Sequence, residues 1–115
     1  MINYDTTLVA ALKTIGLGVY YELFCDSSIN KPCITYMQAN DAQDLTGDTL
    51  GYSRIQYYIK LWGDDLSVLN PYRLSIDEKM RSLGFDRISF NQLTADSQIC
   101  QIMLYEATAY ENFNN

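Results

Sequence analysis

Hydrophobic and polar residues alternate most regularly in the stretch YSRIQYYIKLW, residues 52–62. One set of alternating positions is apolar or aromatic: Ile55, Tyr57, Ile59 and Leu61. The other set is polar or amphipathic: Arg54, Gln56, Tyr58 and Lys60. A period of two is typical of a strand with one buried face. The stretch therefore predicts a strand with one side on a core and the other side toward solvent or a partner.

Four other stretches predict strands: VYYELFC at 19–25, CITYMQA at 33–39, FDRISFNQL at 85–93 and QICQIMLYEATAYENF at 98–113. They are rich in the β-branched and aromatic residues that strands favour. The polar stretch NDAQDLTGDTLG, residues 40–51, separates the strands at 33–39 and 52–62. We expect it to be the long loop of an antiparallel hairpin. Residues 110–115 are expected to form a flexible tail.

Two stretches predict helices. In DTTLVAALKTIG, residues 5–16, Asp5 is a candidate N-cap and the apolar residues recur at helical spacing. A second helical region covers 63–84, where Asn70 and Pro71 supply a cap and a first-turn proline, so the main helix is expected to start there. Its apolar stripe is expected to consist of Tyr72, Ile76, Met80 and Leu83, and its charged side is expected to carry i, i+4 ion pairs. The residues of these pairs are Arg73, Asp77 and Arg81.

The element order is α-β-β-β-α-β-β. A chain of 115 residues is enough for one hydrophobic core, so we expect a single domain over residues 1–115. Helices at two points in a mostly antiparallel sheet define an α+β fold, with both helices packed on one sheet face.

Charge and composition limit the function. Fourteen acidic and eight basic residues give a net charge of −6, whereas proteins that hold nucleic acid need clustered Lys and Arg. Ten tyrosines favour strands and contact surfaces. No signal peptide is recognisable, and no apolar run approaches the roughly 18 residues that span a bilayer. Three cysteines without C-x-x-C spacing, Cys25, Cys33 and Cys100, are expected to be buried free thiols in a reducing cytoplasm.

The candidate chemistry is confined to carboxylates, because the chain has no histidine and no phosphate-binding glycine loop. Asp41, Asp44 and Asp48 are spaced i, i+3, i+7, which does not match a calcium loop. They are interpreted as a solvated hairpin loop or an acidic surface with an electrostatic role, and a weak divalent-ion site remains an alternative. We expect no enzyme activity, no cofactor and no dedicated metal site.

Four segments carry a resemblance to a known family: PCITYMQ, YSRIQYYIKLWGDD, MRSLGFDRIS and ICQIMLYEA. With the predicted element order, they resemble the tail terminator (tail completion) proteins of long-tailed bacteriophages. The resemblance covers most of the chain, from the first helix to the last strand. It is a pattern without a catalytic signature.

The resemblance implies a structural virion protein made in the host cytoplasm. Its copies would form a ring, a hexamer, that caps the head-proximal end of the tail tube and ends tube polymerisation. The implied partners are other copies of the chain, the tail tube protein and the head–tail connector or stopper protein. DNA would pass through the ring without specific binding.

The resemblance also implies roles for particular residues. In a ring, Asp41, Asp44 and Asp48 would line the channel with negative charge, past which DNA slides. Three residues near the end of the alternating strand are candidates for subunit or tube contacts: Tyr58, Lys60 and Trp62.

Other functions stay open at this point. A head-closure or stopper protein of the same virion would have a similar sequence pattern. A monomeric α+β module could bind a small molecule or peptide through its tyrosines and tryptophan. A carboxylate-dependent metal hydrolase is a third and weaker hypothesis.

Overall fold

The computed structural model describes residues 4–22, 31–45, 50–95 and 97–112. Five strands form one sheet in the order β1-β2-β3-β5-β4. The strands are β1 (Gly18–Tyr21), β2 (Cys33–Leu45), β3 (Leu50–Gly63), β4 (Asp86–Ala95) and β5 (Gln98–Asn112). β1 runs parallel to β2, and all other neighbouring strands are antiparallel. The predicted α+β fold and its element order are confirmed.

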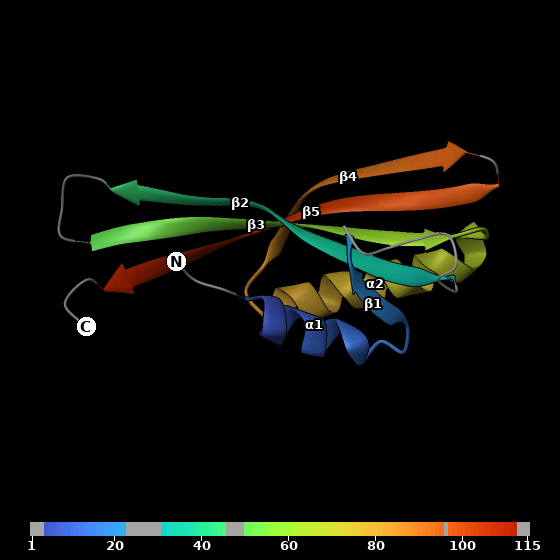
Figure 1. Ribbon diagram of the computed structural model, residues 1–115, viewed down its shortest axis with the longest axis horizontal. Helices are drawn as coiled ribbons and strands as arrows, with labels where there is room; N and C mark the ends of the chain where they lie inside the picture. Colours follow the sequence, from blue (N-terminus) through green and yellow to red (C-terminus); the bar gives the residue numbers. More distant parts are fainter. Residues whose placement is uncertain (1–3, 23–30, 46–49, 96, 113–115) are drawn as a thin grey trace.

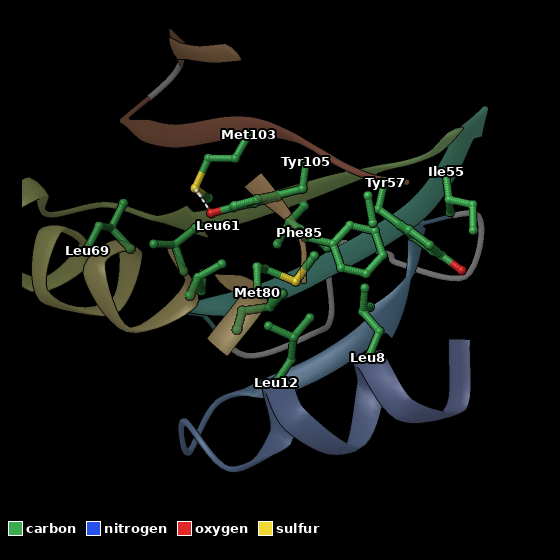
Figure 2. Packing of buried hydrophobic residues seen from close by; sticks show 14 of the residues in the cluster. Leu8, Leu12, Ile55, Tyr57, Leu61, Leu69, Met80, Phe85, Met103 and Tyr105 are labelled. Carbon is green, nitrogen blue, oxygen red and sulfur yellow. Dashed lines mark hydrogen bonds between the residues drawn. The ribbon is translucent and has the colours of Figure 1, made fainter. Parts of the chain in front are cut away.

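Both helices, α1 (Asp5–Lys13) and α2 (Leu66–Ser82), cover the same face of the sheet (Figure 1). The alternating residues of β3 lie as predicted, because Ile55, Tyr57, Ile59 and Leu61 are all buried. They meet two leucines of α1 and the apolar stripe of α2 (Figure 2): Leu8, Leu12, Leu69, Ile76 and Met80. Each fully buried side chain of this size stabilises the fold by about 1.5–3 kcal/mol. The core therefore lies between the helices and β2, β3 and β5.

The predicted start of the second helix is wrong. α2 begins at Leu66, and its N-cap is Asp65, whose carboxylate accepts a hydrogen bond from the Ser67 backbone N–H at 3.0 Å. Pro71 lies inside the helix, where it removes one backbone hydrogen bond. The first turn of α2, before the proline, stays helical because Leu69 in that turn is fully buried. Leu69 packs closely on Gly63: a Cβ added at Gly63 would come within 2.6 Å of Leu69 Cδ2.

The first helix also differs from the prediction at its start. Tyr4 is the N-cap residue, and Asp5 is the first helical residue. The Asp5 carboxylate accepts a hydrogen bond from the Tyr57 hydroxyl, so it ties α1 to β3 instead of capping the helix. Asp5 is a residue type that favours N-caps, but its hydrogen bond to the Tyr57 hydroxyl joins residues far apart in the sequence and could not be predicted from local pattern.

Gly84 ends α2 with a backbone φ of +90°, in the region that favours glycine. We expect Gly84→Ala to lower the free energy of unfolding by about 1–2 kcal/mol, because an alanine Cβ is strained in this conformation. The surroundings add nothing to this cost, since no atom lies within 4 Å of an added Cβ. Urea denaturation measures the loss. Gly84→Asn should lose less, and equal losses for the two variants would contradict backbone strain as the cause.

Candidate functional site

The acidic stretch at residues 40–51 does not form the predicted long loop. β2 continues to Leu45 and β3 begins at Leu50, so Asp41 and Asp44 are strand residues paired in register with Ile55 and Tyr52. Asp48 lies outside the described residues. Asp is disfavoured in strands, which is why its density suggested a loop. Here the acidic end of β2 is hydrogen-bonded to β3, and β5 pairs with the other edge of β3.

This arrangement changes how the carboxylates can act. Side chains in a strand alternate between faces, and positions 41 and 44 are an odd number of residues apart. The two positions therefore belong to opposite faces of β2, which argues against one ion shared between them. Lining of a channel depends on an assembled ring, and it stays a prediction.

The strands β2, β3 and β5 extend beyond the helices as a ribbon, which accounts for the elongated shape in Figure 1. We call residues 40–45, 50–53 and 108–112 the arm. β1 pairs only with residues 33–36 of β2, and β4 pairs only with residues 98–106 of β5. Within the described chain, both outer strands of the arm therefore have a sheet neighbour on one side only.

The three predicted contact residues lie together on the sheet face that the helices leave open. Tyr58, Lys60 and Trp62 are half-buried on β3. The Trp62 indole Nε1–H donates to Thr35 Oγ1 at 2.9 Å, and the Lys60 ammonium pairs with the Glu22 carboxylate. The structure thus brings these side chains to one surface. Their role in a contact is untested.

A shallow hollow of about 220 Å³ adjoins Trp62 on this face. Burial raises the pKa of the Cys100 thiol at its floor to about 11, so the thiol is protonated at neutral pH and a poor nucleophile. Cys33 and Cys100 are buried thiols, as predicted, and Cys25 lies outside the described residues. The hollow is lined by Lys60, Trp62, Leu93, Ala95, Gln98, Cys100 and Ile102.

Sequence reasoning missed a cluster where α2 meets β4. The guanidinium groups of Arg73 and Arg87 lie over the Phe90 ring, at 5.1 Å and 5.4 Å from its centroid. Arg87 Nη1 lies 3.3 Å from Asp77 Oδ2, and Asp77 also accepts the Tyr105 hydroxyl hydrogen. Burial, and then this hydrogen bond, raise the pKa of Tyr105, which keeps the hydroxyl as a donor.

The predicted pairing of Asp77 along the helix is therefore wrong. Asp77 was expected to face solvent between Arg73 and Arg81, but it turns to the sheet and pairs with Arg87 of β4. Alternation along β4 gave no signal for the cluster, because positions 87 and 90 are an odd number of residues apart. The strand has a register shift between Arg87 and Ser89, which local sequence does not reveal. The pairing of β4 with β5, which brings Arg87 opposite Tyr105, is a long-range property.

Among the described residues, no group of three or more Cys, Asp or Glu side chains is placed to hold a metal ion. Neither helix in the described part of the chain is long and apolar enough to span a bilayer. No protein-family model matches the chain, and no curated protein matches it significantly. The α+β fold and the sheet edges that have no neighbour within the described residues are therefore the features from which a function has to be inferred.

Proposed function

We propose that the protein is a structural component of a long-tailed bacteriophage that forms a ring, a hexamer, at the head-proximal end of the tail tube. The ring ends tube polymerisation and joins the tail to the head connector, and DNA passes through its channel. The observation that supports this best is the pair of open sheet edges together with the protruding arm. The resemblance in four segments of the sequence supplies the particular assembly.

Open edges need partners. All ten residues of β4 are exposed, although the strand carries three large apolar side chains. A long exposed edge strand is a template for pairing with another chain, and proteins that stay monomeric protect such edges. A closed ring gives every subunit the same pair of neighbours and leaves no edge to associate without limit.

Charge supports the passage of DNA. The net charge of −6 and the carboxylates of the arm oppose stable phosphate contacts. A channel lined by Asp41, Asp44 and Asp48 would let DNA slide because like charges repel. Tyr58, Lys60 and Trp62 offer an aromatic and polar surface to a neighbouring subunit or to the tube protein.

Native mass spectrometry and negative-stain electron microscopy test the ring. We expect six-fold assemblies, either alone or with the tail tube protein present. Adding the protein to polymerising tube protein should shorten the tubes and place a ring at one end. Binding to the connector without an effect on tube length would instead favour a stopper protein.

A monomer without affinity for tube or neck proteins would contradict the proposal. A small molecule that stabilises such a monomer specifically would favour the ligand-binding module. In that case a ligand at 100 times its Kd adds about 2.7 kcal/mol to the free energy of unfolding.

A further inference from the structure

The outer edge of the sheet along β4 is uncharged for most of its length (Figure 1). Within the described chain β4 has a neighbouring strand on one side only, and every residue of β4 is exposed. Its charged residues, Asp86 and Arg87, come first, and a register shift between Arg87 and Ser89 separates them from the rest of the strand. Residues 89–95 contain no Asp, Glu, Lys or Arg. This segment therefore lacks the charges and prolines that keep an edge strand from pairing with another chain.

The midpoint of the uncharged segment, Gln92, is held from the inside of the sheet. The Gln101 side chain is 1% exposed, and its Nε2 donates to Gln92 Oε1 at 3.1 Å and to Asn70 Oδ1 at 3.2 Å. These bonds connect the edge strand to β5 and α2 and turn the Gln92 carbonyl oxygen inward. The Nε2 group of this exposed residue is left for solvent or for a strand outside the edge.

Both faces of the edge carry exposed apolar side chains. Phe90 is 38% exposed on the side of the helices, where Arg73 of α2 stacks over its ring. Leu93 is 61% exposed on the face that the helices leave open, where it borders the hollow next to Trp62. A further strand beside β4 would remove part of this apolar surface from water, which is favourable.

We propose that this edge pairs with the same edge of a second copy, antiparallel, about a two-fold axis at Gln92 and over residues 89–95 of each copy. The two sheets then form one continuous sheet, with all helices on the same face. The two Gln92 amides meet at the axis, where each Nε2 donates to the other Oε1. On the open face, Leu93 lies opposite Asn91 of the second copy and diagonally across the axis from the second Leu93.

The placement of charge favours a second copy as the partner. In this register the two Phe90 residues, which carry Arg73 and Arg87 over their rings, are about 13 Å apart along the strands. This separation exceeds the Debye length of about 8 Å at physiological ionic strength, so the arginines of the two copies repel only weakly. Two identical edges also match in length and in the absence of charge, and pairing protects both at once.

The contact goes beyond the proposed ring and does not rest on it. Neighbours in a six-fold ring meet through two different surfaces, whereas this contact joins one surface to itself. The dimer is therefore a form of the unassembled protein in which the uncharged edge is covered. A contact made by one strand from each copy is small, so the dimer is reversible and can separate for assembly.

Charges placed at Leu93 test the contact. Leu93→Lys and Leu93→Glu each put like charges across the two-fold axis, and each alone should need at least about tenfold more protein than the wild type for half-dimerisation. An equimolar mixture of the two should dimerise about three- to tenfold more tightly than either alone, because opposite charges then meet. Sedimentation velocity over a concentration series, without tube protein, measures these differences.

The controls separate the contact from folding and from total charge. Leu74→Lys is the matched control, because Leu74 on α2 is also 61% exposed, and it should dimerise like the wild type. Thermal unfolding shows whether each variant is folded. Added salt should tighten the wild-type dimer, because it screens the net charge of −6 on each copy, whereas a contact made by ion pairs would weaken.

A cysteine at the axis tests the register. Gln92→Cys would place two thiols on directly opposite residues, whose Cα atoms lie about 4.5–5.5 Å apart, within the range that a disulfide requires. Mild oxidation should link this variant into a covalent dimer, and Leu74→Cys should stay unlinked. The wild type, treated in the same way, gives the background from its own cysteines.

The outcomes distinguish this contact from the ring. A wild type that is monomeric or hexameric without tube protein would overturn the contact, as would folded Leu93 variants that dimerise as tightly as the wild type. Absence of the cross-link in folded Gln92→Cys would also overturn it. Dimers that meet these expectations but neither form rings nor shorten tubes would overturn the ring and leave the contact standing.

Discussion

Replacing Phe85 by alanine is expected to lower the free energy of unfolding by about 3–5 kcal/mol. Phe85 is 1% exposed and follows directly on Gly84, so the end of α2 directs its ring into the core (Figure 2). The ring makes edge-to-face contacts with Tyr4 and Tyr57, at centroid distances of 5.4 Å and 5.8 Å. Truncation would remove these contacts with Tyr4 and Tyr57 and would leave a cavity in the core.

The size of this loss matters because domains of this kind are stable by only about 5–15 kcal/mol. Urea denaturation with a common m value measures the difference. Leu74→Ala is the control, because Leu74 is an apolar residue of α2 that is 61% exposed, and its replacement should stay within about 0.5 kcal/mol. Similar losses for the two variants would contradict the assignment of Phe85 to the core.

The sequence predicted those parts of the fold that depend on local periodicity. The alternation in β3 identified its buried face, and the stripe of α2 identified Ile76 and Met80 as core residues. Residue propensity alone misled at two places. Pro71 suggested a helix start, although burial of Leu69 extends the helix past it, and the aspartates of β2 suggested a loop, although pairing with β3 holds them in a strand.

The candidate surfaces were predicted only in part, for the same reason. Tyr58, Lys60 and Trp62 share a face because they alternate in one strand, which a sequence shows. The arginine cluster around Phe90 depends on the placement of β4 beside β5 and α2, which local patterns do not determine. Which edges of a sheet remain open is likewise a result of strand order, and the proposed ring depends on it.

A rise in pH from 10 to 11 should destabilise the protein steeply. Burial raises the pKa of Tyr57 and Tyr105 above the ordinary value of 10.0, and their hydrogen bonds to Asp5 and Asp77 raise it further. Burial likewise raises the pKa of Cys100 from 9.0 to about 11. In this range the unfolded chain releases protons that the folded chain keeps, so the free energy of unfolding falls as pH rises.

A group that is protonated in the folded chain and deprotonated in the unfolded chain contributes about 1.4 kcal/mol per pH unit. Because the three groups are only partly in this regime between pH 10 and 11, together they contribute about 3 kcal/mol over this unit. Urea denaturation at pH 8, 10 and 11 measures this slope. Tyr105→Phe should be less stable at pH 8, because Asp77 loses a hydrogen-bond donor. Its free energy of unfolding should then fall less steeply with pH than that of the wild type, because one of the three titrating groups is missing. Tyr20→Phe, at a residue 36% exposed, should keep the wild-type slope. An unchanged slope in Tyr105→Phe would mean that the buried hydroxyl groups do not cause the alkaline transition.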